Sequence, residues 1–373
     1  MLFTNGLLFT ADRGYVSGGF TVENGRFGEF FFDERRGGTD LGGAKILPGL
    51  VDAHTHGAMG ADFSDGDPEG LTRMARYLAE NGVTSFAPTT MTLPYETLAA
   101  AFATAVSLRD KRPAGCARVA GIHMEGPFFS EKKKGAQNAA YLRLPDFEAF
   151  KALYEGCGGL LRIVDLAPEL PGAADFARKA SRLCTVSVAH TDADFEQTLA
   201  VYEAGASHLT HLFNAMPPIH HRKPGVIGAA SQREDVAAEL ICDGLHVHPS
   251  SVRMAFKLFP GRICLISDSL RCCGMPDGEY ELGGQQVFLS GGVARLADGT
   301  IAGAAANLFQ DLRNALAFGI PEREAVTAAT LTPARELGRE DEIGSLAPGR
   351  YADFLVCGEA LSLQAVYMGG EKL

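Results

Sequence analysis

The stretch PGLVDAHTHG, residues 48–57, places two histidines two positions apart at the end of an apolar run. Side chains alternate along a β-strand, so His54 and His56 would point to the same side of a sheet. Neutral imidazole is the commonest metal ligand in proteins and suits zinc, iron, copper or nickel. A hydrogen-bonded pair of structural histidines is the alternative interpretation, and the H-x-H spacing alone does not decide between the two.

Four further stretches end an apolar run on a polar side chain. They supply His123 with Glu125, then His190, His211 and Asp268. In a barrel of parallel strands, the carboxyl ends of all strands meet at one mouth, where active sites lie. Five strand ends that carry His, Glu or Asp are hard to explain as five unrelated structural residues, so the pattern favours a metal site.

The elements that would position these residues are short apolar strands that alternate with helices. Residues 71–82, LTRMARYLAENG, are typical of a helix that ends at Asn81-Gly82, and residues 83–90, VTSFAPTT, follow as a strand. The same order recurs along residues 46–344, which predicts a (β/α)8 TIM-like barrel. A doubly wound sheet is the alternative, but no G-x-G-x-x-G follows the first strand.

Three segments depart from this alternation and have β-strand character. Residues 1–45 contain the hairpin signal Asn24-Gly25, and residues 345–373 return to the same character. We expect these two ends of the chain to form one small β-sandwich domain beside the barrel. Residues 276–300 are predicted to form β-hairpins inserted between barrel elements.

The composition limits the class of protein. Hydrophobic residues make up 46% and charged residues 21% of the 373 residues, which is typical of a globular chain. The net charge of −11 argues against a nucleic-acid surface, and no apolar run is long enough for a membrane helix. The eight cysteines form no C-x-x-C pair and the start lacks a basic secretory region, so we expect a reduced, cytoplasmic protein.

Several motifs, in order along the chain, resemble the N-acetylglucosamine-6-phosphate deacetylase family of the amidohydrolase superfamily. They are ILPGLVDAHTHG, GIHMEGPF, VAHTDAD, THLFNAMPP, GLHV, ISDS and IGSLAPGRYADFLV. H-x-E-G-P followed by T-H-L-x-N-A-M is specific to this family, whereas the opening H-x-H and the closing G-x-x-A-D are shared more widely. The resemblance implies a metal-dependent amidohydrolase barrel that releases acetate and glucosamine 6-phosphate.

The resemblance also implies roles for individual residues. Glu125, His190 and His211 fall on metal-ligand positions, and Asp268 falls on the catalytic acid/base. Some members keep the first H-x-H, while others replace it and hold one metal. Because His54 and His56 keep the pair, one or two divalent ions are expected, with zinc or iron both suitable. The positions that fall on substrate contacts are Ala136, Asn214, Ala215, Arg222, His246, Ala302 and Gly303.

Two features of the resemblance bear on assembly and catalysis. In the family, the residues at Arg222 and His246 bind phosphate and reach into the neighbouring subunit's site, which implies a homodimer. Some members have a histidine after the K-K-G motif that helps polarise the acetyl carbonyl, whereas this chain has Gln137. The three lysines at 132–134 are most simply a solvated loop that borders the mouth.

Two other functions are compatible with parts of the pattern. One is another amidohydrolase activity, on a related N-acyl amino sugar or an N-acyl amino acid. The other is a binding or scaffold protein that has kept the barrel and lost its ligands, which the full ligand set argues against. Nearby, His208 lies three positions before His211, so strand alternation predicts that it faces away from the site and is structural.

Overall fold

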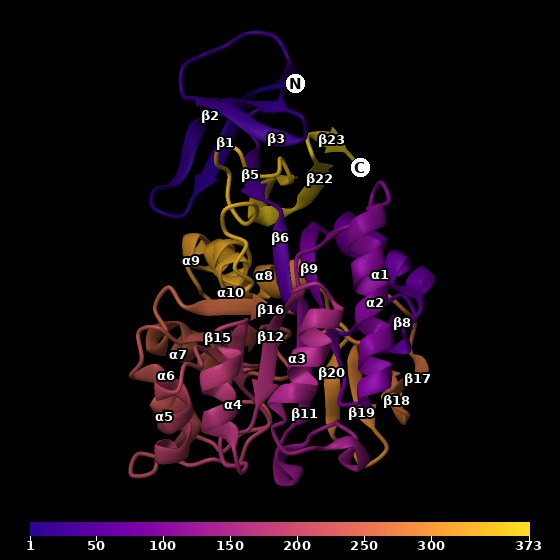
Figure 1. Ribbon diagram of the computed structural model, residues 1–373. Helices are drawn as coiled ribbons and strands as arrows, with labels where there is room; N and C mark the ends of the chain where they lie inside the picture. The colour runs from indigo at the N-terminus through magenta and orange to yellow at the C-terminus, as the bar shows by residue number, and fades with distance from the viewer.

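The computed structural model describes residues 1–373 and contains a parallel barrel, a mixed sheet built from the two ends of the chain and a separate antiparallel sheet (Figure 1). The hydrogen-bonded order of the barrel strands follows the chain, as expected of repeated βα units. The eight strands are β6 (Leu50–Thr55), β9 (Val83–Thr90), β11 (Ile122–Phe128), β12 (Leu161–Leu166), β13 (Thr185–Val188), β14 (His208–Leu209), β15 (Ala237–Ile241) and β16 (Ile263–Ile266).

The barrel is nearly closed where its last strand meets its first. The backbone N–H of Asp268 donates to the carbonyl of His54 at 3.0 Å. Beside it, Ser267 Oγ donates to Asp52 Oδ2 at 2.6 Å. The predicted (β/α)8 architecture is therefore confirmed.

Helices follow the strands and form the outer layer. Between the barrel strands lie α1 (Pro68–Glu80), α2 (Tyr95–Lys111), α3 (Phe147–Gly156), α4 (Ala173–Ala180), α5 (Phe195–Glu203), α6 (Gly225–Ser231) and α7 (Pro249–Leu258). After the last strand come α8 (Leu308–Ala317), α9 (Glu322–Ala328) and α10 (Leu331–Glu336). The start of α1 illustrates the local signals, because Asp67 accepts hydrogen bonds from the backbone N–H groups of Glu69 and Gly70 and Pro68 occupies the first turn.

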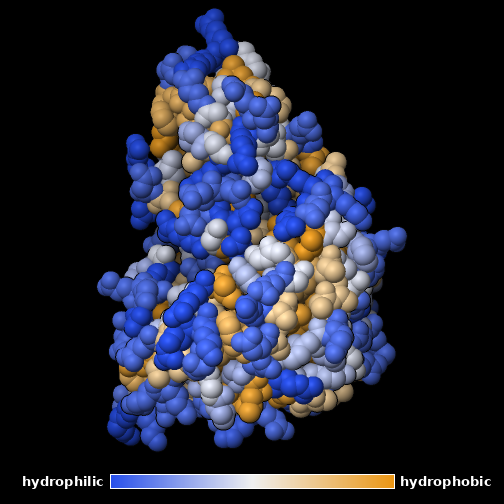
Figure 2. All heavy atoms as spheres, in the orientation of Figure 1, coloured by the Kyte–Doolittle hydropathy of each residue, from blue (hydrophilic) through white to orange (hydrophobic).

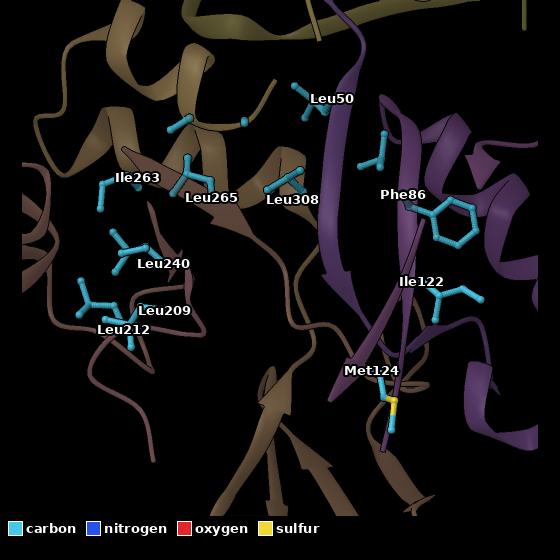
Figure 3. Packing of buried hydrophobic residues seen from close by; sticks show 14 of the residues in the cluster. Leu50, Phe86, Ile122, Met124, Leu209, Leu212, Leu240, Ile263, Leu265 and Leu308 are labelled. Carbon is cyan, nitrogen blue, oxygen red and sulfur yellow. The ribbon is translucent and has the colours of Figure 1, made fainter. Parts of the chain in front are cut away.

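One large hydrophobic cluster joins the strands to this helical layer. Figure 3 shows part of it, with Leu50, Phe86, Ile122 and Leu240 from four barrel strands and Leu308 from α8. Side chains on alternate positions of each strand are thus available for the barrel interior. Packing in this cluster holds the strands in place, and the strands in turn position the polar side chains at their ends.

The two ends of the chain share one sheet, which lies at one pole of the molecule in Figure 1. In it, β5 pairs antiparallel with β21, with Ile46 opposite Val356. Phe3, Phe20 and Phe354 pack against one another in the hydrophobic core of this small domain. The strands are β1 (Leu2–Thr10), β2 (Gly14–Glu23), β3 (Arg26–Phe31), β4 (Thr39–Asp40), β5 (Lys45–Pro48), β21 (Phe354–Cys357), β22 (Leu363–Met368) and β23 (Glu371–Lys372).

An antiparallel sheet lies where hairpins were predicted. It contains β17 (Gly278–Leu282), β18 (Gln285–Ser290), β19 (Val293–Leu296) and β20 (Ile301–Ala304). The backbone of Ala304 exchanges hydrogen bonds with Asp268 and Leu270, both at 2.9 Å, so this sheet is attached directly to the end of β16. It consequently stands beside the mouth of the barrel.

Short elements complete the fold: β7 (Gly57–Ala58), β8 (Ala61–Asp62), β10 (Arg118–Val119) and the 3-10 turns η1 (Phe63–Asp65), η2 (Glu131–Lys133), η3 (Ala139–Tyr141) and η4 (Glu359–Leu361). None of the helices has the length and apolar character that a membrane crossing requires. On the face drawn in Figure 2, hydrophilic side chains cover most of the surface and apolar ones form small patches.

Candidate active site

Three of the candidate residues lie two positions beyond the end of a barrel strand, in the same unusual backbone conformation. His190 follows β13, His211 follows β14 and Asp268 follows β16, with φ angles of 42°, 30° and 48°. Non-glycine residues seldom adopt a left-handed conformation, which is found preferentially at functional sites. The barrel thus uses one kind of turn three times to direct side chains into its mouth.

Glu125, on β11, forms a compact group with His190 and His211. Its Oε1 atom lies 3.0 Å from His190 Nε2 and 3.2 Å from His211 Nε2. The two Nε2 atoms are 3.1 Å from each other. All three side chains are at least nine-tenths buried. Three donor atoms therefore converge on one point at the mouth of the barrel.

A second group lies beside the first and contains His54, His56 and Asp268. The Nε2 atoms of the two histidines are 3.3 Å apart. Asp268 Oδ1 lies 3.5 Å from His54 Nε2 and 3.2 Å from His56 Nε2. The groups adjoin through Glu125, whose Oε2 atom is 3.4 Å from His56 Nε2.

The donor atoms in both groups have the spacing that a divalent metal requires. Ligand atoms about 2.0–2.1 Å from a tetrahedral zinc lie about 3.3 Å from one another. The separations within the two groups, 3.0–3.5 Å, match this value. Two unprotonated imidazole nitrogens that face each other at 3.1 Å would repel, whereas a shared cation satisfies both. The residues fit a metal centre.

Neighbouring groups hold these side chains in orientation. His190 Nδ1 donates to the carbonyl of Lys133 at 2.9 Å, which leaves its Nε2 free to face the first group. His54 Nδ1 donates to Glu239 Oε2 at 2.9 Å, with the same result for the second group. Gln137 Nε2 donates to Glu125 Oε2 at 2.6 Å. Such second contacts fix the tautomer and the direction of metal ligands.

The charges in the site favour its ionised carboxylates. Burial alone would raise the pKa of Glu125, but the imidazoles of His190 and His211 beside its carboxylate, when they are protonated, hold it well below its usual range. Burial likewise opposes ionisation of Asp268, while the neighbouring imidazoles of His54 and His56, when they are protonated, lower its pKa. Both carboxyl groups are therefore negative at neutral pH and available to bind a cation or accept a proton.

A cavity of about 310 Å³ opens above the two groups. Its wall includes six of the seven positions expected to contact substrate, four of the five expected metal ligands and the expected catalytic acid/base, Asp268. These are Ala136, Asn214, Ala215, His246, Ala302 and Gly303, with His56, Glu125, His190, His211 and Asp268. Gln137 also lines it, together with Met91, Gly135, Thr300 and Ile301. His54 lies beneath this cavity and is fully buried.

The two predicted phosphate-binding positions lie in different places relative to the cavity. Arg222 is exposed, contacts His221 Nε2 at 2.7 Å and does not line the cavity of its own chain. His246 lines this chain's own cavity, and its predicted reach into a neighbouring subunit's site remains a prediction. Asp243 accepts a hydrogen bond from His246 Nδ1 at 2.6 Å and from its backbone N–H at 2.9 Å, and so turns the ring inward.

The prediction for the orientation of His208 is wrong. Strand alternation does not extend to His211, because β14 ends at Leu209 and the chain then turns. His208 is fully buried and contacts two carboxylates, Glu239 at 3.2 Å and Glu336 at 2.8 Å. Although burial opposes the charged form, these two partners raise the pKa of His208 to about 10. It lies in a polar layer beneath the site.

Sequence reasoning missed the carboxylates of that layer. Glu239 lies in the middle of the buried strand AAELI, and Asp165 lies in LRIVDL. A charged residue inside a buried apolar strand needs a partner, and that signal could have identified both. Asp165 contacts His123 Nε2 at 2.8 Å, while His123 Nδ1 donates to the carbonyl of Ala53 at 3.1 Å. Both ring nitrogens of His123 are thereby occupied, which excludes it as a metal ligand in this geometry.

The fold and the site together define a (β/α)8 hydrolase with a histidine–carboxylate metal centre at the mouth of the barrel. The family model described as "Amidohydrolase family" matches residues 46–372. The chain therefore belongs to the amidohydrolase family, whose members typically depend on divalent metal ions, and its His, Glu and Asp groups could hold them.

Several individual proteins of known activity are similar to this chain. The N-acetylglucosamine-6-phosphate deacetylase of Vibrio furnissii is 36% identical over 332 residues, 88% of this chain and 83% of that protein. The N-acetylgalactosamine-6-phosphate deacetylase of Escherichia coli O157:H7 is 36% identical over 328 residues, 87% of each chain. A mutant N-acetyl-D-glucosamine-6-phosphate deacetylase from Mycobacterium smegmatis, solved in complex with N-acetyl-D-glucosamine-6-phosphate, matches with 32% identity and a TM-score of 0.91, covering 100% of this chain and 98% of that one.

Proposed function

We propose that this chain hydrolyses the acetyl amide of N-acetylglucosamine 6-phosphate, giving acetate and glucosamine 6-phosphate. The observation that carries the proposal is the convergence of His190, His211 and Glu125 on one point beneath a cavity of about 310 Å³. The relatives that share the fold over nearly the whole chain are sugar-phosphate deacetylases, which supports the substrate class. The reaction belongs to amino-sugar breakdown.

The chemistry that a divalent ion supplies in such a centre is activation of water at neutral pH and polarisation of a carbonyl oxygen. Asp268 lies at the boundary between the centre and the cavity, with Oδ1 3.2 Å from His56 Nε2. Its ionised carboxylate can accept a proton from the attacking water and deliver it to the amide nitrogen as the C–N bond breaks. Without that proton the amine is a poor leaving group. We assign Asp268 as the catalytic acid/base.

Each of the two donor groups can hold one ion. Glu125, His190 and His211 hold the first ion in this proposal, and His54, His56 and Asp268 provide a second position. Nitrogen and oxygen ligands suit zinc and ferrous iron equally, so either metal fits. Gln137, whose amide is held beside Glu125, lines the cavity where the family resemblance implies a carbonyl-polarising histidine in some members.

Phosphate recognition in the proposal involves one residue inside the cavity and one outside it. His246 faces the cavity and is held by Asp243. Arg222 is exposed and does not line the cavity of its own chain, so in this proposal it reaches the phosphate in the cavity of a second chain. We therefore propose a homodimer in which Arg222 completes the neighbouring site. The expected cytoplasmic location and the absence of nucleic-acid partners remain predictions.

A second substrate is favoured by one specific observation. The N-acetylgalactosamine-6-phosphate deacetylase of Escherichia coli O157:H7 matches this chain with the same 36% identity as the Vibrio furnissii enzyme. The two sugars differ only in the configuration of one hydroxyl group. An N-acyl amino acid is a third possible substrate, and it would not use the phosphate contacts.

One experiment tests these alternatives together. Purified protein is analysed for bound metal, and acetate release is measured with N-acetylglucosamine 6-phosphate, its galactosamine isomer and unphosphorylated N-acetylglucosamine. We expect bound divalent metal and the highest kcat/KM with the glucosamine phosphate. Higher kcat/KM on the galactosamine phosphate would favour the second substrate. Equal turnover with and without phosphate, or no turnover in metal-loaded protein, would refute the proposal.

A further inference from the structure

Glu239 is a buried carboxylate on β15 that contacts the metal-site residues from below. Its side chain is fully buried within the barrel. Its Oε2 atom accepts hydrogen bonds from His54 Nδ1 at 2.9 Å and from the backbone N–H of His211 at 3.1 Å. Its Oε1 atom lies 3.2 Å from His208 Nε2. One carboxylate thus contacts a residue from each of the two donor groups.

The contact with His54 determines which nitrogen of that ring can bind a metal. A neutral imidazole carries one N–H and one lone pair. Because Nδ1–H donates to Glu239, the lone pair must lie on Nε2, the atom that faces His56 and Asp268 at 3.3 and 3.5 Å. His56 has no corresponding support, since its Nδ1 atom is buried without a hydrogen-bond partner. His54 is therefore the oriented histidine of this group.

The other donor group depends less on Glu239. Its His190 is oriented by the carbonyl of Lys133, and Gln137 holds Glu125. Only the backbone of His211 contacts Glu239. The side-chain contacts of this group are thus independent of the buried carboxylate.

We infer that Glu239 is a positioning residue that makes His54 a ligand and so builds the centre formed by His54, His56 and Asp268. His208 contacts the other oxygen of Glu239, and Glu336, the last residue of α10, contacts only His208. This inference rests on the proposed metal-dependent function. It explains how a second metal position is built, because Glu239 orients His54. A hydrogen-bond partner behind a ligand is typically worth ten- to a hundredfold in metal affinity.

The test measures metal binding at each position separately. Metal-free protein is titrated with Zn²⁺ by calorimetry, and a His56→Asn variant identifies which binding step belongs to the second centre. We expect two ions per chain in the original protein. Glu239→Met, which removes the acceptor, should weaken the second step about a hundredfold, and Glu239→Gln, which keeps one acceptor oxygen, about tenfold. The first step should change much less in both variants.

Glu336→Gln is the matched control, because it alters the same contact chain at His208 without touching a ligand. It should bind both ions as the original protein does. Circular dichroism shows whether each variant is folded, and Glu239→Gln decides the question if Glu239→Met does not fold. Unchanged binding in Glu239→Gln and Glu239→Met, equal weakening of both steps, or a single ion in the original protein would overturn the inference.

These outcomes are separable from those that bear on the proposed reaction. Protein that binds two zinc ions and loses one on substitution of Glu239, yet releases no acetate from any sugar phosphate, would refute the reaction and support the inference. Protein that deacetylates the sugar phosphate with a single bound ion would support the reaction and refute the inference.

Discussion

Gln137 Nε2 donates a hydrogen bond of 2.6 Å to Glu125 Oε2, the carboxylate oxygen that His190 and His211 do not contact. The amide is fixed in this direction because Gln137 Oε1 accepts the backbone N–H of Thr92 at 2.7 Å. A neutral side chain therefore orients the carboxylate shared by the site. Gln137 cannot titrate near neutral pH, so this support is independent of pH.

Substitution of Gln137 should weaken the metal centre. Gln137→Leu keeps the approximate size and removes the donor to Glu125. A hydrogen bond to a charged group contributes about 1.5–3 kcal/mol, so metal affinity should fall by roughly ten- to a hundredfold. Metal content after dialysis against a weak chelator measures this. Gln137→Asn keeps an amide on a shorter side chain, so it controls for the loss of packing at this position. Full retention of metal in Gln137→Leu would contradict the prediction.

Asp268→Asn should separate catalysis from binding. The amide has the size of the carboxylate and cannot accept the proton of the attacking water, so kcat should fall by roughly 10² or more, the scale of general acid–base catalysis. Substrate affinity should change little, because the cavity wall is otherwise intact. Steady-state kinetics together with binding of the sugar phosphate to the variant measure both quantities. Nearly normal kcat would exclude Asp268 from proton transfer.

Arg222→Ala should reduce activity only toward a phosphorylated substrate, and only in a dimer. A charge-assisted contact contributes about 1.5–3 kcal/mol, so kcat/KM on the 6-phosphate should fall by roughly ten- to a hundredfold. Activity on unphosphorylated N-acetylglucosamine should be nearly unchanged. His246→Gln, which alters a residue lining the chain's own cavity, is the comparison variant and should reduce activity on the 6-phosphate without any need for a second chain.

Kinetics and the molecular mass in solution are measured on the same Arg222→Ala preparation. A monomer with the full phosphate preference of the original protein would refute the shared site. So would equal losses on the two substrates.

The buried ion pairs of His208 should make stability depend on pH. The pKa of His208 is raised from 6.5 to about 10, so its charged form contributes stability that is fully present below pH 6.5 and is lost as pH rises toward 10. The free energy of unfolding of metal-free protein should therefore decrease over this range by more than in a His208→Gln variant. Urea unfolding at pH 6.5, 8 and 10 measures the difference. Parallel pH profiles for the two proteins would show that His208 is neutral in the folded state.

The sequence by itself determined the order of elements and the residues at the ends of strands. Strand-then-helix alternation, the turn at Asn81-Gly82 and the H-x-H pair at His54 and His56 are local patterns, because hydrophobic periodicity and turn chemistry act over a few neighbouring residues. A barrel brings all strand ends to one mouth, so these local signals also predicted that the donors would meet.

The tertiary structure alone decided which side chains support and complete the site. The partnership of Glu239 with His54 joins residues far apart in the chain, and no local pattern encodes it. The inward turn of His208 depends on where β14 ends, and that of His246 depends on Asp243. Arg222 carries the character of a phosphate ligand in the sequence, yet its place outside the cavity follows from the path of its loop. Periodicity sets which face a residue occupies, but closure of the barrel sets its neighbours.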